Sequence, residues 1–466
     1  MKGFAVKEHA PSILVAALSS AFGVAVLEFF AVLTTVIEAG RATGDSDTVA
    51  LLLGLVSWVF IAIAMYVSTV VTVNTFATII AGRTSTIALL RLIGSSAEAQ
   101  RRSVAREGFI VGVIGALIGG VVGTGFTAVV VETGPSIGLL PDGEYAIVTP
   151  HIVLPVIAVV LTTWLASWIG SRRVLSVSPM EATGAAVEHS REETVSSKSR
   201  TATAVSLFVI GGGILVLSVF LGLVTPGAVL IGIVGGLLSF TGLVIGAHLV
   251  MPPALRIVGR LLGSSAPARL AAENAVRYPE RASRTTIGLV IGVTLVTMFA
   301  VALQCYLNLI NAAASADPTY YQGIDETLLL TVAVFSILVG FSAVIAAVGM
   351  INNLSMSVLQ RTRELGLLRA LGFSARQVRS MILAESAQLT LASVLVGLVL
   401  GSFYGWVGAQ SLLGSINGSP GLVPPGIPLP FVLGVFVLAA ALTAVASVGP
   451  SRRATRVSPV AALAVR

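Results

Sequence analysis

The stretch LLRLIGSSA at Leu89–Ala97 returns as LLRALGFSA at Leu367–Ala375, with six of nine letters identical. The match extends upstream, because RTSTIALLRLIG from Arg83 agrees with RTRELGLLRALG from Arg361 at six of twelve positions without a gap. Both stretches are polar and basic, in a chain whose other segments are mostly apolar. A phrase repeated in this way indicates an internal duplication.

A second pair of phrases supports the duplication. SRRVLSVSP from Ser171 matches SRRATRVSP from Ser451, at nearly the same spacing along the chain as the first pair. A weaker pair, AVK from Ala5 and AVR from Ala275, also recurs. The two stronger pairs fall in the same order at this common spacing, so we expect two copies of one unit in the chain.

The composition excludes a soluble protein. Hydrophobic residues make up 55% of the 466 residues, the mean hydropathy is +0.97, and only 11% are charged, less than half the share typical of soluble domains. The net charge of +7 would suit a nucleic-acid partner. We expect no such partner, because the basic residues form short blocks between apolar segments, as in proteins oriented across a membrane. Cys305 is the only cysteine, so no intrachain disulfide can form.

Ten apolar segments are long enough to cross a hydrocarbon core about 30 Å thick. The expected spans are 12–37, 49–81, 108–131, 151–170, 203–223, 228–250, 286–310, 327–352, 384–409 and 429–449. With the N-terminus placed in the cytoplasm, 27 of the 28 lysines and arginines fall on inner segments. Only Arg41 falls on an outer loop, together with nine acidic residues. This separation predicts that both termini are cytoplasmic.

The sequence therefore predicts an all-α polytopic membrane protein with ten transmembrane helices. Spans 1–4 and 7–10 form two four-helix repeats, and spans 5 and 6 join them. Both repeats begin inside, so they are parallel, with a pseudo-twofold axis along the membrane normal. The expected domains are a first repeat at 1–182, a polar cytoplasmic linker at 183–202, two linking helices at 203–250, a basic cytoplasmic segment at 251–284 and a second repeat at 285–466.

The repeated phrase lies between the second and third spans of each repeat, on the predicted cytoplasmic side. Gly94 and Gly372 are expected to end a helix, since glycine is favoured just past a helix C-terminus. Ser95, Ser96 and Ser374 offer N-cap oxygens for a new short helix, which we expect to lie roughly parallel to the membrane. An interfacial helix whose arginines reach lipid phosphates would explain the charge, but not the recurrence in both halves.

The segments RTRELGLLRALGFSARQVRSMILAES and PSRRATRVSPVAAL resemble the signature of FtsX-like permeases, the membrane subunits of ABC systems of the macrolide-exporter and lipoprotein-release type. Ten spans in two repeats are most similar to the bacitracin-resistance type. The large extracellular domain of those relatives has no counterpart in the short loops 38–48 and 311–326. This makes a role that needs a folded external arm less expected.

The resemblance implies that the segment after each Leu-Leu-Arg phrase is a coupling helix that docks on an ATPase. Carried over, these segments fall at about Ser95–Arg102 and Phe373–Arg379. The docking residues expected from the resemblance are Ser95, Ser96, Ala97, Gln100, Arg101, Phe373, Ser374, Ala375, Gln377 and Arg379.

The resemblance also implies the assembly and its location. One permease chain is expected to bind two copies of a separate cytoplasmic ABC ATPase, which holds ATP and Mg²⁺, in the lipid of a bacterial plasma membrane. The chain itself is expected to bind no cofactor and not to be an enzyme. Its only lysines, at positions 2, 7 and 198, do not end a glycine-rich P-loop, and its four histidines lack metal-ligand spacing.

Three polar residues inside predicted spans are candidates for substrate contact or gating. Glu28 is an acid well inside the first span, where an ionisable group is a functional candidate. A carboxylate that reaches outer water or a hydrogen-bond partner is the simpler interpretation, and proton coupling is a third. Gln304 and Asn308 share one face of the seventh span, where they either bond to another helix or line a substrate cleft.

The combined features predict the permease of an ABC exporter-like system that moves a hydrophobic or amphiphilic substrate such as a lipid, peptide or antibiotic. An ATP-driven transmitter that signals to a membrane or envelope partner without transport is the main alternative. An ion-driven secondary carrier is a third possibility, although a carrier of that kind has no need of paired coupling phrases.

Overall fold

A computed structural model describes residues 6–39, 89–90, 93–138, 152–171, 198–261, 279–316, 367–415 and 421–456, with scattered residues within 51–73, 140–147 and 331–347 and residue 273. Of the described residues, 89% are helical and none lies in a strand. The all-α prediction is therefore confirmed for the part of the chain that the structure describes.

The helices form two groups of three with a hairpin between them in sequence. In the first group, α4 (Ala97–Thr133) packs against α1 (Val6–Ala39) and α5 (Val153–Gly170). In the second, α15 (Ala375–Leu413) packs against α12 (Pro279–Ala316) and α16 (Leu429–Arg456). The hairpin consists of α8 (Lys198–Leu221) and α9 (Ala228–Ile245). A short 3₁₀ helix, η1 (Pro135–Ile137), follows α4.

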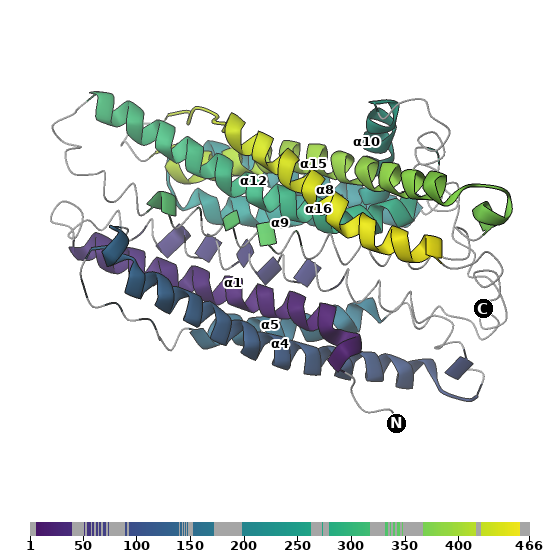
Figure 1. The fold of residues 1–466 in the computed structure, drawn as a ribbon. Coiled ribbons are helices and arrows are strands. Elements are labelled where there is room, and N and C mark those ends of the chain that lie inside the picture. Colours follow the sequence, from purple (N-terminus) through teal and green to yellow (C-terminus); the bar gives the residue numbers. More distant parts are fainter. Residues whose placement is uncertain are drawn as a thin grey trace.

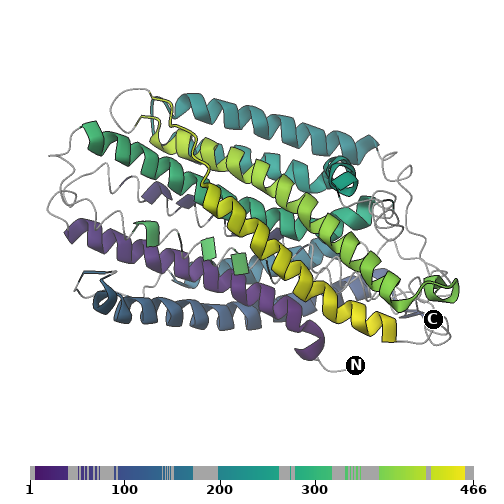
Figure 2. The same cartoon turned by 45° about the horizontal axis from the view of Figure 1, so that its top comes forward.

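The long helices run roughly side by side, with the two groups on opposite sides of the bundle (Figures 1 and 2). Helices α1, α4 and α15 begin at the same end, where α16 finishes (Figure 1). We call this the tip end of the molecule. The starts of α4 and α15, which carry the two repeated phrases, therefore lie at one end of the bundle.

Six described helices are long and apolar enough to cross a membrane: α1, α4, α8, α9, α12 and α15. Two shorter apolar helices, Val153–Ile169 and Leu429–Ala441, match two further predicted spans. The predicted spans at 49–81 and 327–352 fall largely outside the described residues. The chain is thus a multi-pass membrane protein, whereas a total of ten spans stays a prediction.

The predicted span at 228–250 is divided in the structure. Helix α9 ends at Ile245, and the N–H of Gly246 donates to the carbonyl of Gly242 at 2.8 Å. A separate helix, α10 (Ala247–Leu261), then crosses the direction of its neighbours (Figures 1 and 2). Uniform hydropathy through Val250 hid this break, because the start of α10 is as apolar as the end of α9.

Glycines bring the helices of each group into close contact. On α4, a methyl group at Gly119 would overlap the carbonyl oxygen of Ala17 on α1. On α15, a Cβ at Gly401 would lie 2.6 Å from the carbonyl oxygen of Thr294 on α12. Small residues at such helix contacts are typical of membrane bundles.

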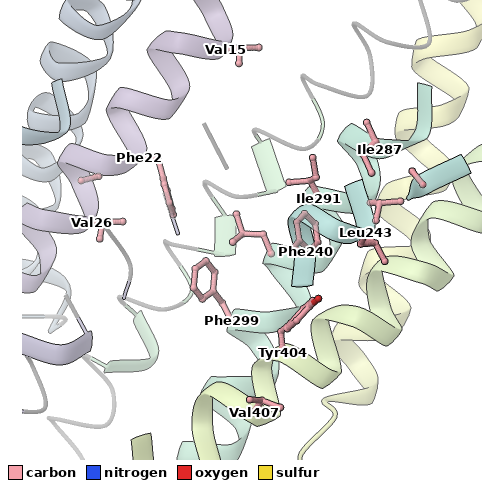
Figure 3. Close-up of a cluster of buried hydrophobic side chains, with 14 of the residues drawn as sticks. Val15, Phe22, Val26, Phe240, Leu243, Ile287, Ile291, Phe299, Tyr404 and Val407 are labelled. Atoms are coloured by element: carbon pink, nitrogen blue, oxygen red, sulfur yellow. The ribbon is translucent and has the colours of Figure 1, made fainter. Parts of the chain in front are cut away.

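A buried apolar cluster joins the helix groups in the middle of the molecule. Phe22 of α1, Phe240 of α9, Phe299 of α12 and Tyr404 of α15 all belong to this cluster, and Figure 3 shows them around one interior. The hydroxyl of Tyr66, a described residue of the predicted second span, lies 2.8 Å from that of Thr241 on α9. Aromatic and hydroxyl contacts thus connect the hairpin to α15 and to Tyr66 of the predicted second span.

We expect Gly119→Ala to lower the free energy of unfolding by about 1–3 kcal/mol, because the added methyl group has no space against α1. Gly125→Ala on the same helix is the control, since no atom lies within 4 Å of a Cβ there. Thermal unfolding in detergent measures both. Equal melting temperatures for the two variants would show that the α1–α4 contact is looser than the structure has it.

Candidate functional site

Each repeated phrase folds into the same glycine turn at the tip end. We call residues 89–97 the first tip and residues 367–375 the second tip. Gly94 has φ of 101° and Gly372 has φ of 99°, in the left-handed region that glycine adopts without a Cβ penalty.

The backbone hydrogen bonds of the two turns also correspond. The N–H of Ser95 donates to the carbonyl of Leu90 at 3.0 Å, and the N–H of Phe373 donates to that of Leu368 at 3.1 Å. This six-to-one bond is the Schellman pattern that ends a helix at glycine. The predicted helix stops at these glycines are confirmed.

A serine caps the helix that follows each turn. The hydroxyl oxygen of Ser96 accepts from the N–H of Ala99 at 3.1 Å, and that of Ser374 accepts from the N–H of Gln377 at 3.2 Å. In the second tip the Gln377 side chain also accepts from the N–H of Ser374 at 2.9 Å, which completes a capping box. The predicted N-caps are confirmed, with Ser96 rather than Ser95 as the cap of the first tip.

The helices that start at these caps are not short. The prediction of a separate short helix was wrong, because α4 continues for 37 residues and α15 for 39. No proline interrupts either segment, and Gly108 is tolerated inside α4 because it packs in a buried position. At 1.5 Å per residue each helix is more than about 50 Å long, well beyond a core of about 30 Å.

Large apolar side chains are exposed at matching positions of both tips. Ile93 is 73% exposed and Leu371, its counterpart in the second copy of the phrase, is 72% exposed. Leu89 and Leu367 form a second exposed pair one turn earlier. Sequence reasoning did not single out any of the four, because hydropathy alone does not distinguish an exposed apolar side chain from a buried one. Side chains of this kind at the end of a protruding helix are suited to insert into an apolar groove of a partner.

The interiors of the two tips differ in chemistry. In the first tip, the amide nitrogen of Gln100 donates to the hydroxyl of Ser95 at 2.8 Å. At the corresponding positions of the second tip, Phe373 packs against a buried cluster of Val378, Met381 and Ile382. A polar bond in one tip thus replaces an apolar contact in the other.

Arg101 contacts the end of α5. Its guanidinium carbon lies 3.9 Å from the ring centroid of Trp168, and its Nε donates to the hydroxyl of Ser171 at 3.4 Å. Both partners lie at the end of α5, where the second repeated phrase begins at Ser171. Arg101 therefore connects the start of α4, just after the first repeated phrase, to the start of the second repeated phrase at Ser171.

The other predicted docking residues lie in the tips or in the first turns of α4 and α15. Ser96 and Ser374 are exposed caps, whereas Ala97, Ala375 and Arg379 are half-buried. The structure brings together the predicted residues of each tip, and their contact with a partner stays a prediction.

Glu28 lies in the contact between α1 and α4. It is 1% exposed, and the hydroxyl of Thr124 donates to its Oε1 at 2.7 Å. Among the described residues, none forms a hydrogen bond with Oε2. The neighbouring ring of Phe29 meets that of Phe126 edge to face at a centroid distance of 6.0 Å. The carboxyl group thus bonds across two helices of one half.

Gln304 and Asn308 bond to each other along α12, with the amide nitrogen of Gln304 donating to Oδ1 of Asn308 at 2.9 Å. Gly426 covers the pair, since a Cβ there would lie 2.7 Å from Cγ of Gln304 and 2.8 Å from Nδ2 of Asn308. We call residues 421–428 the strap. The expected bond between helices is therefore a bond within one helix, beneath the strap.

Side chains of α15 hold the strap in place. The amide of Gln410 donates to the carbonyl of Gly421 at 3.0 Å and accepts from the N–H of Val423 at 2.7 Å. The indole N–H of Trp406 donates to the carbonyl of Val423 at 3.0 Å. Sequence reasoning missed both residues, although a glutamine inside an apolar run is a signal that a polar partner is near.

The described residues hold no group of three or more histidine, cysteine, aspartate or glutamate side chains placed to bind a metal ion.

The FtsX-like permease C-terminal family matches the chain twice, over residues 58–179 and residues 336–459. The second match is displaced along the chain from the first by the same spacing that separates the copies of the repeated phrases. Together the two matches cover more than half of the chain.

Individual relatives match over a shorter region. An uncharacterized ABC transporter permease of Bacillus subtilis (strain 168), YknZ, is 28% identical over 141 residues, which are 30% of this chain and 33% of the relative. The ABC transporter permease YtrF of the same organism is 27% identical over 146 residues, 30% of this chain and 34% of its own. The pyoverdine export ATP-binding/permease protein PvdT of Pseudomonas syringae pv. tomato is 31% identical over 153 residues, 33% of this chain and 21% of its own. The chain thus spans about a third or less of the length of these relatives.

We expect Phe373→Ser, which gives the second tip the residue of the first, to destabilise the start of α15 by about 1–3 kcal/mol because apolar packing is lost. Hydrogen exchange of the amides at 375–382 measures the change. Leu371→Ser is the control, since this side chain is exposed and its removal costs little. Equal exchange in both variants would contradict a packed second tip.

We expect Thr124→Val to lower the free energy of unfolding by about 1–3 kcal/mol, because it leaves a buried oxygen of Glu28 without its donor. Glu28→Gln is expected to keep the wild-type melting temperature or raise it, since the amide oxygen still accepts from Thr124. A loss in Glu28→Gln as large as in Thr124→Val would mean that the negative charge itself is required.

Proposed function

Because this chain belongs to the FtsX-like permease family, we propose that it is the membrane subunit of an ABC exporter-like system whose ATP is hydrolysed on a separate polypeptide. The observation that carries the proposal is the pair of matching tips, each with a left-handed glycine, a serine cap and an exposed apolar side chain at the same position. Two equivalent sites on one chain suit two copies of the same partner.

The proposed complex contains one permease chain and two ATPase copies. The pairing of the helices supports two repeats, because α4 packs between α1 and α5 as α15 packs between α12 and α16. The spacing of the two family matches supports the same arrangement. With ten spans and both termini in the cytoplasm, the tips would face the compartment that supplies ATP.

Movement would pass from the tips into the membrane along α4 and α15. ATP binding would close the ATPase dimer and draw the tips together. Helices α4 and α15 begin at the last residue of each tip and continue without a break, so a displacement of Ala97 or Ala375 would move the whole helix as one rod. The glycine contacts with α1 and α12 would transmit the movement to the first helix of each half.

The proposed substrate is a hydrophobic or amphiphilic molecule such as a lipid, peptide or antibiotic, moved between the two halves. The aromatic cluster in the middle of the molecule supports an apolar path. A related sequence is named for pyoverdine export, and transport of an amphiphile out of the cell is the corresponding class for this chain. The chain itself would bind neither ATP nor Mg²⁺.

The strap supports a second candidate function, that of an ATP-driven transmitter. It displays Leu422 and Ile427 at the end opposite the tips, and α15 links it directly to the second tip. An ATP-driven transmitter without transport would use such a surface to contact an envelope partner. Stimulation of ATP hydrolysis by an amphiphile favours transport, whereas stimulation by a protein partner favours transmission.

Co-purification with the ABC ATPase encoded beside the permease tests the central proposal. We expect wild type to retain two ATPase copies, and Ile93→Asp/Leu371→Asp to weaken the complex at least about tenfold, because a carboxylate cannot enter an apolar groove without loss of solvation. Both positions are exposed, so the fold should survive.

Leu422→Asp is the matched control. This leucine is 74% exposed and lies on the strap, away from the tips, so the variant should bind the ATPase as wild type does. If the double variant binds the ATPase as well as wild type does, the tips are not the docking sites. Absence of any ATPase from the wild-type preparation would instead point to an ion-driven carrier, with Glu28 as the residue to test.

A further inference from the structure

Helix α10 lies across the bundle on its tip-end half. It runs across the long axes of α12 and α15 in both views (Figures 1 and 2). It packs on α9, α12 and α15. A helix across a bundle of membrane-spanning helices lies roughly parallel to the membrane surface.

The depth of α10 in the membrane follows from its contact with α15. The side-chain amide of Gln388 on α15 donates to the carbonyl of Leu255 at 2.9 Å, and Gln388 is fully buried. The predicted apolar span of α15 begins at 384, so Gln388 lies one turn inside it. Helix α10 therefore sits at the boundary between hydrocarbon and headgroups on the tip side.

The two faces of α10 differ sharply. One face is buried in the protein through His248, Met251, Leu255 and Val258. The other face forms an exposed stripe that consists of Val250, Pro253, Arg256, Ile257 and Arg260. Apolar and basic side chains together on one face are typical of a helix in the interfacial region of a membrane.

Arg256 and Arg260 are available to an external ligand. They lie one helical turn apart, both are exposed, and Ile257 between them is 61% exposed. Within the described part of the chain, neither guanidinium has an ion pair or hydrogen bond. Two free guanidiniums at headgroup depth match the charge and geometry of phosphate oxygens.

We propose that α10 is a binding site for the phosphate headgroups of anionic lipids, formed by Arg256 and Arg260 on a helix that Gln388 fixes to α15. The site is separate from the tips, and it does not depend on the proposed ATPase partner. Because α15 begins at the second tip, lipid bound at α10 would hold the same rod that the partner moves.

The test uses the full chain in detergent without any ATPase. Phosphatidylglycerol and phosphatidylcholine are titrated in separate series over the same range of mole fractions. The melting temperature of the protein is measured at each point. We expect phosphatidylglycerol alone to raise the melting temperature, since only the anionic headgroup gains from the two guanidiniums. This rise in melting temperature should become smaller as the salt concentration is increased.

In Arg256→Gln/Arg260→Gln, the apparent affinity for phosphatidylglycerol is expected to fall roughly 30-fold. Arg256→Lys/Arg260→Lys should retain most of the affinity, because both charges remain. The matched control is Arg102→Gln/Arg106→Gln, which removes two exposed arginines at the same spacing from α4. This control should bind phosphatidylglycerol as wild type does.

Three results would overturn the proposal. The first is a wild type that phosphatidylglycerol and phosphatidylcholine stabilise equally. The second is an α10 double variant with unchanged affinity for phosphatidylglycerol. The third is an equal loss in the α4 control, which would show that net charge, rather than α10, attracts the lipid.

Discussion

A membrane leaves a polypeptide few ways to move. In hydrocarbon every backbone N–H and carbonyl must be paired within the protein, so a spanning segment stays helical and shifts as a unit. Helices α4 and α15 satisfy this constraint over 37 and 39 residues, with their first turns beyond the expected core. Each can therefore connect an aqueous tip to the middle of the membrane without a flexible joint.

Close glycine contacts determine which neighbouring helices move together with α4 and α15. Gly119 and Gly401 bring backbones together where any larger residue would collide with a helix of the same half. Such contacts leave little room for independent sliding, so α1 should follow α4 and α12 should follow α15. At the end opposite the tip, Gln410 and Trp406 fix the strap to α15, so the rod links two exposed surfaces.

The sequence was sufficient for the features that depend on local chemistry. Helix stops at Gly94 and Gly372 and a cap at Ser374 follow from backbone preferences that act within a few residues, and the structure confirms them. The all-helical class follows from hydropathy alone. The family signature could be recognised in the sequence for the same reason, since its phrases are short polar segments between apolar ones.

Features that depend on packing were not readable. Ile93 and Leu371 occupy apolar positions that a periodic pattern assigns to a buried face, yet they protrude because the chain turns at the next residue. The start of α10 has the composition of a spanning helix, yet it packs across α12 and α15 instead of continuing α9. The partners of Glu28 and Gln410 lie 96 and at least 11 residues away, so local sequence does not identify them.

The most direct measurement is the distance between the two tips in the assembled complex. Arg102→Cys and Ser380→Cys place spin labels at equivalent exposed positions next to the tips, which leaves Ile93 and Leu371 in place to bind the ATPase, and the native Cys305 is buried. Pulsed electron paramagnetic resonance then gives the distance distribution with a hydrolysis-deficient ATPase, without nucleotide and with ATP. We expect ATP to shift the distribution to shorter distances. An identical distribution in both states, with ATPase bound, would contradict the assignment of the tips as the parts that ATP moves.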